Sequence, residues 1–179
     1  MSNLISITAA LLVGTLIICS CPSSAQEPVT DLTNSPAFDH TIRSYLSFEV
    51  PVMTVADLKK DLDEFVLLDT RSIEEYEVSH IRGARFVGYK SFDAETLGDI
   101  AKDKTIVVYC SIGYRSEKIG EKLQRLGYMN VFNLYGSIFE WVNDDNPIFD
   151  IHGNETQLLH TYNRAWSKWV VNEAVQKTW

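Results

Sequence analysis

The stretch TIVVYCSIGYRS, residues 105–116, decides the fold because it joins a strand to a helix. Residues 105–109 are β-branched or apolar throughout, which is typical of a central parallel strand buried on both faces. Ser116 is expected to begin a helix that runs to about Leu126 and stops at Gly127. The residues between the two elements, beginning with Cys110, then form a tight strand-to-helix turn.

Strand and helix patterns alternate on both sides of this turn. Short apolar runs predict strands at 65–69, 84–87 and 131–134, and Gly136 precedes a last short helix that contains Trp141. Thr54 is expected to cap a helix through Leu62, and the sequence SIEE at 72–75 has capping-box spacing for another helix. The alternation predicts an α/β fold of three layers, with a central parallel sheet and helices on both faces. In such sheets the ligand site lies beyond the carboxyl ends of the strands, where Cys110 is expected.

The residue types in the turn predict a reactive cysteine. Backbone N–H groups of such a turn form an anion-binding nest, and the following helix adds the positive end of its dipole. A thiol in that position has a lowered pKa. Gly113 permits the tight path, Arg115 supplies a fixed positive charge, and Ser116 is expected to cap the helix. Taken alone, Cys110 could be a small hydrophobic residue that ends a strand. Its combination with Gly113, Arg115 and Ser116 favours a functional thiolate.

Composition limits the partners. The chain has 179 residues, of which 45% are hydrophobic, and a formal net charge of −8. This size fits one domain with additional segments at its ends. The negative charge argues against nucleic acid as a partner and against electrostatic docking on anionic lipid. A small anionic substrate stays compatible with it, because a local basic site can override the global field.

The N-terminus predicts export. Residues 1–26 contain no Asp, Glu, Lys or Arg, and the apolar run at 4–18 is typical of a signal peptide. The sequence ICSC at 18–21 resembles a bacterial lipobox, in which a lipidated Cys21 begins the mature chain; cleavage after Ala25 is the alternative. We therefore expect a signal peptide at 1–21, a flexible linker at 22–40, and a protein that is periplasmic or anchored to a membrane through Cys21. An uncleaved anchor is less favoured, because the run is shorter than the roughly 20 residues that span a bilayer.

Several motifs, in order, resemble the rhodanese domain. They are LLDTR at 67–71, EY at 75–76, HIRGA at 80–84, the Cys110 turn, and Gly136 with Trp141. The resemblance covers about residues 50–145, so we expect a rhodanese domain at 41–147. It implies transfer of sulfane sulfur, from thiosulfate or another donor, through a cysteine persulfide to a thiophilic acceptor, without a cofactor.

Carried over by position, the resemblance assigns the active site. Cys110 is the nucleophile, and the active-site loop consists of Ser111, Ile112, Gly113, Tyr114 and Arg115, followed by Ser116. Four residues separate the cysteine from the arginine, as in the sulfur-handling members of this fold. The related phosphatases and arsenate reductases have five, which widens the cradle for a tetrahedral oxyanion. The loop length therefore favours sulfur chemistry.

Residues around the loop receive structural roles. We expect Asp69, Arg71 and Glu75 to form ion pairs that support the loop, with contact to substrate as the alternative. His80 and Trp141 are interpreted as architectural. His152 and His160 have no further ligands at metal spacing, so no metal is expected. Ser137 stands where the family frequently has the second of two glycines.

The tail at 148–179 is predicted to be a helical extension. Its apolar residues, from Leu158 to Val175, are spaced as in one or two amphipathic helices. We expect the tail to pack on the domain; a partner surface is the alternative.

Two functions stay open. One is a sulfurtransferase that takes sulfur from a small donor such as thiosulfate and gives it to a thiol, to a cyanide-like acceptor or to a protein. The other is a persulfide carrier or sensor that delivers sulfur to a protein with little small-molecule turnover.

Overall fold

The computed structural model describes residues 32–98 and 100–179. The predicted signal peptide, the candidate lipidation site Cys21 and most of the predicted linker lie outside these residues. Within the described part, no helix combines the length and the hydropathy that crossing a bilayer requires.

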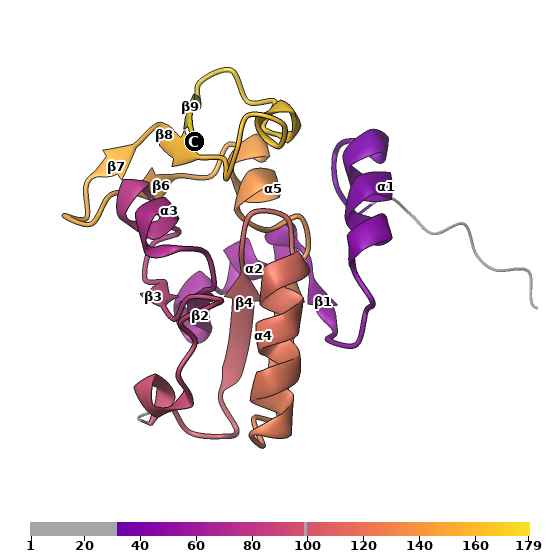
Figure 1. Ribbon diagram of the computed structural model, residues 1–179, viewed down its shortest axis with the longest axis vertical. Coiled ribbons are helices and arrows are strands. Elements are labelled where there is room, and N and C mark those ends of the chain that lie inside the picture. The colour runs from indigo at the N-terminus through magenta and orange to yellow at the C-terminus, as the bar shows by residue number, and fades with distance from the viewer. Residues whose placement is uncertain (1–31, 99) are drawn as a thin grey trace, which may run out of the picture. The chain divides into compact units, whose positions relative to one another are not determined.

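A five-stranded parallel sheet lies at the centre of the described body (Figure 1). In spatial order its strands are β1 (Val52–Met53), β5 (Asn130–Leu134), β4 (Thr105–Tyr109), β2 (Val66–Asp69) and β3 (Arg85–Phe86). All neighbouring strands are parallel, and the register places Asp69 beside Tyr109. The carboxyl ends of β2 and β4 therefore lie together. The predicted α/β fold with a central parallel sheet is confirmed.

Helices cover both faces of this sheet. They are α1 (Pro36–Tyr45), α2 (Val55–Lys60), α3 (Ile73–Val78), α4 (Tyr114–Arg125) and α5 (Ser137–Asn143), with 3-10 turns at Leu62–Glu64, Ala94–Leu97 and Ser167–Trp169. Successive side chains of β4 point to opposite faces. Val107 and Tyr109 lie in a buried cluster with side chains of α2 and α5. Ile106 and Val108 lie in a second cluster, with side chains of α4. The central strand is thus buried on both faces, as its sequence predicted.

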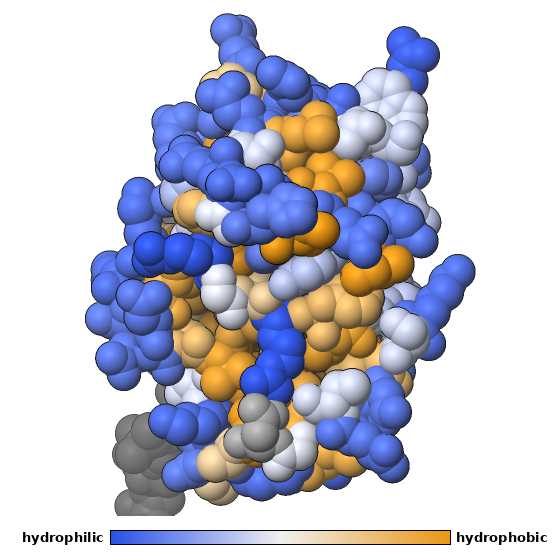
Figure 2. Space-filling model, turned by 90° about the vertical axis from the view of Figure 1, so that its left-hand side faces the viewer, coloured by the Kyte–Doolittle hydropathy of each residue, from blue (hydrophilic) through white to orange (hydrophobic). Residues whose placement is uncertain are grey.

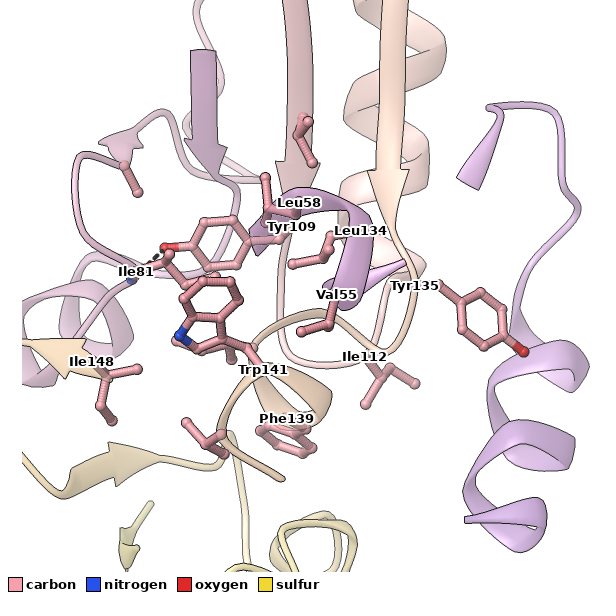
Figure 3. Close-up of a cluster of buried hydrophobic side chains, with 14 of the residues drawn as sticks. Val55, Leu58, Ile81, Tyr109, Ile112, Leu134, Tyr135, Phe139, Trp141 and Ile148 are labelled. Atoms are coloured by element: carbon pink, nitrogen blue, oxygen red, sulfur yellow. Dashed lines mark hydrogen bonds between the residues drawn. The ribbon is translucent and has the colours of Figure 1, made fainter. Parts of the chain in front are cut away.

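The cluster against α2 and α5 also anchors the turn that follows β4 (Figure 3). The Tyr109 hydroxyl accepts a hydrogen bond from the Ile81 backbone N–H at 3.2 Å. Trp141 lies in the same cluster and donates its indole N–H to the Pro147 carbonyl at 2.8 Å, so it is a core residue. Ile112, from the turn itself, is buried here as well. The buried side chain of Ile112 therefore fixes the turn to the hydrophobic core.

Two helices, α2 and α3, begin where the sequence predicted. The Thr54 hydroxyl accepts a hydrogen bond from the Asp57 N–H at 3.1 Å and caps α2. Ser72 and Glu75 form the predicted capping box of α3. Such caps satisfy N–H groups that the first helical turn leaves without partners.

The start of α4 differs from the prediction. The helix begins at Tyr114, and Gly113 is its N-cap, with φ of +122°, a conformation that glycine adopts without strain. Ser116 therefore does not cap the helix, because the turn is completed before it. Its hydroxyl instead points inward, 2.7 Å from the Asn133 Oδ1 and 3.0 Å from the Gly113 carbonyl oxygen.

The prediction of a flexible linker is wrong for residues 36–40, which lie in α1. Ser35 caps this helix, and Phe38 is 1% exposed. The buried Asp39 carboxylate accepts a hydrogen bond from the Tyr135 hydroxyl at 2.9 Å. One apolar ring and one anchored carboxylate fix a segment whose composition resembles that of a linker.

The predicted helical extension at 148–179 is also wrong, because this segment consists mainly of short strands and turns (Figure 1). β6 (Ile148–Phe149) pairs antiparallel with β7 (Glu155–Thr156), and β8 (Leu158–His160) pairs parallel with β9 (Gln176–Thr178). Asparagine side chains satisfy further backbone groups: Asn172 donates to the Val142 carbonyl at 2.7 Å, and Asn143 accepts from the Val171 N–H at 2.8 Å. Such bonds compete with helix formation.

Figure 2 shows the face that carries α3, β3 and β7. Hydrophobic side chains are visible there in recesses between hydrophilic ones. This face is therefore of mixed character and not uniformly charged.

Candidate active site

Cys110 directly follows β4, at the carboxyl ends of the parallel strands, where the sequence placed it. Its side chain is 1% exposed. The Gly113 N–H donates a hydrogen bond to the Cys110 Sγ at 3.2 Å. The sulfur therefore lies inside the turn and faces its backbone donors.

The surroundings of Cys110 favour the thiolate. Burial disfavours a charged sulfur, but the charge of Arg115 and the N–H groups of Ser116 and Gly113 outweigh it, so the pKa of the Cys110 thiol lies below its usual value. These groups belong to the first turn of α4 and its N-cap, where helix N–H groups and the helix dipole stabilise negative charge.

Arg115 is held in place by Glu75. The guanidinium donates two hydrogen bonds to the Glu75 carboxylate, at 2.6 and 2.8 Å, and a third to the Ser111 hydroxyl at 2.9 Å. Burial disfavours the Glu75 charge, yet hydrogen bonds and charge from Arg115 lower the pKa of Glu75 to about 2. Both partners are therefore ionised at neutral pH. The pair joins the start of α3 to the loop; a supporting role was expected for Glu75, but Arg115 was not predicted as its partner.

Asp69 and Arg71 form a second, separate ion pair, and both side chains are fully buried. The Arg71 Nη2 lies 2.6 Å from an Asp69 carboxylate oxygen and donates at 2.6 Å to the Ser79 carbonyl. Burial alone would lower the pKa of Arg71, but Asp69 raises it above the ordinary value. The pair ties the end of β2 to the end of α3.

Two polar residues that the sequence analysis did not assign to the site hold the turn. The Asn133 side-chain amide donates to the Gly113 carbonyl at 3.0 Å. The Ser137 hydroxyl accepts the Cys110 N–H at 3.2 Å and donates to the Leu134 carbonyl at 3.1 Å. Two sequence features could have indicated these roles. Asn133 is a polar residue inside an otherwise largely apolar strand, and Ser137 stands where the family frequently has the second of two glycines. Ser137 adopts a left-handed conformation, with φ of +54°.

A cleft of about 830 Å³ opens at Cys110. The loop contributes Ser111, Ile112, Tyr114 and Arg115 to its lining, together with the supporting residues Arg71 and Glu75. Aromatic side chains from three other segments complete the walls: Tyr45, Phe86, Tyr89, Tyr162 and Trp166. Tyr114 was expected here as a residue of the loop and is 42% exposed; the aromatic residues of the other segments were not predicted from the sequence.

His80 and Arg82, from the HIRGA motif at 80–84, are not among the residues that line the cleft, whereas His160 is. The His80 Nδ1 lies 3.1 Å from the Tyr76 carbonyl oxygen, and the two rings stack with centroids 4.1 Å apart. Arg82 is exposed and lies 3.7 Å from an Asp63 carboxylate oxygen. Across residues 32–98 and 100–179, no group of three or more His, Cys, Asp or Glu side chains is placed to hold a metal ion.

These features define an α/β protein with a buried cysteine at a strand-to-helix turn. The family model of the rhodanese-like domain matches residues 54–144, and the chain belongs to this family. Most of the features of the candidate site, from β2 through α5, lie within the matched range.

Curated relatives share this domain and little else of their length. The tRNA uridine(34) hydroxylase of Bdellovibrio bacteriovorus is 34% identical over 90 residues, which cover 48% of this chain and 25% of that protein. The probable adenylyltransferase/sulfurtransferase MoeZ of Mycobacterium tuberculosis is 28% identical over 99 residues, 53% of this chain and 25% of that protein. The chain thus spans about a quarter of the length of these relatives.

A solved structure has the same fold. The rhodanese-like domain from Anabaena sp. superposes with a TM-score of 0.52 at 24% sequence identity, covering 56% of this chain and 80% of that one. This similarity agrees with the observed central parallel sheet.

Proposed function

We propose that this chain is a sulfurtransferase that moves sulfane sulfur through a persulfide on Cys110. The observation that carries the proposal is a buried thiol with a lowered pKa, in contact with the Gly113 N–H and under the charge of Arg115. A thiolate is the nucleophilic form of cysteine. Membership of the rhodanese-like family and the similarity to a probable adenylyltransferase/sulfurtransferase support this proposal.

The proposed reaction has two half-reactions. With thiosulfate as donor, the Cys110 thiolate attacks the outer sulfur, a new S–S bond forms, and sulfite leaves with the electron pair of the broken bond. A thiolate or cyanide then attacks the terminal sulfur of the persulfide, and the Cys110 thiolate is released. Backbone N–H groups of the loop and Arg115 stabilise the negative sulfur throughout. The sequence of steps needs no cofactor.

The experiment is a thiosulfate:cyanide assay on the wild type and on Cys110→Ser. The substitution changes one atom at the end of β4 and is expected to leave the fold intact while abolishing thiocyanate formation. Leu126→Ala, at an exposed residue near the end of α4, is the matched control and should keep full activity. Thiocyanate formation by the Cys110→Ser variant at the wild-type rate would refute the proposal.

A persulfide carrier or sensor is the second candidate. Exposed aromatic residues around the cleft favour it: Tyr45, Tyr114 and Tyr162 are 47%, 42% and 53% exposed, and surface aromatic groups are enriched where proteins bind partners. A carrier would load Cys110 stoichiometrically and turn over slowly with every small acceptor, whereas a sulfurtransferase would turn over repeatedly.

We also propose that the protein is exported and anchored through a lipid on Cys21 or released into the periplasm. The support is the sequence at 1–26, which has no charged side chain and a lipobox-like ICSC motif. The net charge of −8 disfavours a nucleic-acid substrate.

A further inference from the structure

The cleft at Cys110 is far larger than a small inorganic donor needs. Its volume is about 830 Å³, whereas pockets of roughly 300–1,000 Å³ usually enclose drug-sized organic ligands. Cys110 is 1% exposed and is one of the lining residues. The cleft therefore has room for an organic group attached to the reacting sulfur.

Aromatic residues from outside the matched domain build much of this cleft. Tyr45 comes from the end of α1, and Tyr162 and Trp166 come from the segment after β8. Residues 54–144 match the family model, so these three side chains lie outside the matched range. The rings of Tyr45 and Trp166 pack edge to face with their centroids 5.3 Å apart. The rings of Tyr45 and Tyr114 are also edge to face, with their centroids 6.4 Å apart. Tyr45, Trp166 and Tyr114 thus form a connected set of rings, and Tyr162 and Phe86 also line the cleft; together these five residues are called the aromatic wall.

Charged groups in the cleft are largely neutralised. Arg115 is paired with Glu75 through two hydrogen bonds, and its guanidinium lies 5.1 Å from the centre of the Tyr162 ring. Arg71 is paired with Asp69. The exposed Lys90 is accompanied by the exposed Glu74 in the lining. The two arginine charges in the cleft are therefore balanced by neighbouring carboxylates.

We infer that the second substrate is a low-molecular-weight organic thiol whose flat apolar or aromatic group packs against Tyr45, Tyr162 and Trp166. This inference rests on the proposed sulfur transfer and specifies its acceptor. Aromatic pairs contribute attraction beyond the burial of apolar area, and an acceptor of this kind fills space that cyanide or a small hydrophilic thiol leaves to water.

The transfer step is balanced without another reactant. The acceptor thiolate attacks the terminal sulfur of the Cys110 persulfide, and a new S–S bond forms on the acceptor. The S–S bond to Cys110 breaks, and its electron pair returns to the Cys110 thiolate. The product is the persulfide of the organic thiol, with no net oxidation or reduction.

The test compares two acceptors that have the same reacting group. Cys110 is first loaded with thiosulfate or glutathione persulfide, and loading is verified by intact mass. Transfer to 2-phenylethanethiol and to 2-mercaptoethanol is then measured as kcat/KM. We expect the wild type to prefer the aromatic thiol by about tenfold or more, the change that one or two favourable ring contacts produce.

Variants of the aromatic wall test whether its rings cause the preference for the aromatic thiol. Tyr162→Ala and Trp166→Ala should each reduce the preference several-fold, mainly through the aromatic thiol, whereas Tyr162→Phe should keep it because the ring remains. Met129→Ala, at a residue that is 69% exposed and outside the cleft lining, is the matched control and should change neither rate.

The outcomes separate the two proposals. Failure to load Cys110 refutes sulfur transfer itself. A loaded enzyme that uses both thiols equally, or variants that lower both rates equally, overturn the aromatic-acceptor inference alone. A loaded enzyme that uses neither thiol but donates sulfur to a reduced protein thiol also overturns the aromatic-acceptor inference, and it assigns the aromatic wall to a protein partner.

Discussion

Replacing Glu75 by glutamine tests the ion pair that positions Arg115. The substitution keeps the size of the side chain and removes its charge. In the wild type, burial disfavours the charge, but Arg115 outweighs burial and lowers the pKa of Glu75 from 4.5 to about 2. This difference corresponds to about 3 kcal/mol of preference for the ionised form in the folded protein. We therefore expect Glu75→Gln to lower the free energy of unfolding by about 3 kcal/mol at pH 7.

The pH dependence has a definite sign. A carboxylate whose pKa is lowered by folding contributes stability that is fully present above the pKa of the unfolded chain, and loses it as the pH falls toward the folded value. The stability difference between wild type and Glu75→Gln should therefore be constant above about pH 5. It should shrink as the pH falls from 4.5 to about 2.

Urea denaturation at several pH values between 3 and 7 measures this difference. Glu77→Gln, at an exposed carboxylate on the same helix, is the control and should change stability by less than about 0.5 kcal/mol. A difference below about 1 kcal/mol for Glu75→Gln at pH 7, or one that does not depend on pH, would show that the pair with Arg115 is not the source of stability.

Three further predictions concern other parts of the chain. Arg71→Ala leaves Asp69 buried without its partner and should lower the free energy of unfolding by about 3–5 kcal/mol, with activity falling in parallel; normal thermal stability with lost activity would make Arg71 a substrate ligand instead. Because the pKa of Cys110 lies below its usual value, the rate of alkylation by iodoacetamide should reach half its plateau at a lower pH than that of free cysteine measured in parallel, and a midpoint at or above that of free cysteine contradicts the proposed activation. In a bacterial host, Cys21→Ala should change processing and release the protein from membranes; a wild-type protein that begins at Gln26 without lipid would rule out the lipoprotein.

The sequence predicted the parts of the fold whose signals are local. The run at 106–109 is apolar at every position because it is buried on both faces, so its pattern identifies the central strand. Thr54 and the Ser72 capping box act within one helical turn, so their sequence spacing is sufficient. Cys110, Gly113 and the four-residue spacing to Arg115 are likewise contiguous, and the loop could be recognised before its geometry was known.

The parts that the sequence did not predict depend on distant contacts. Phe38 is buried through contacts with the tail, including Trp169, with ring centroids 5.4 Å apart. The tail itself has helix-like apolar spacing, but strand pairing between residues nearly 20 positions apart gives it another structure. Asn133 and Ser137 join the loop through hydrogen bonds across 20 and 27 residues. No local pattern contains such information.

The aromatic wall of the cleft likewise depends on contacts between distant residues, so the sequence did not predict it. Tyr45 and Trp166 are more than a hundred residues apart in the chain, yet their rings are in contact beside Cys110. Each residue alone is an ordinary aromatic side chain. Only the fold brings them to the reacting sulfur.

The most direct test of the account is the intact mass of the protein after incubation with a sulfur donor. We expect wild-type protein treated with thiosulfate or glutathione persulfide to gain the mass of one sulfur atom, and cyanide or a thiol to remove it. Arg115→Ala should load more slowly, and Cys110→Ser should gain no sulfur. A wild-type protein that stays unmodified by both donors, or a Cys110→Ser variant that still acquires the sulfur, would contradict the claim that Cys110 carries it.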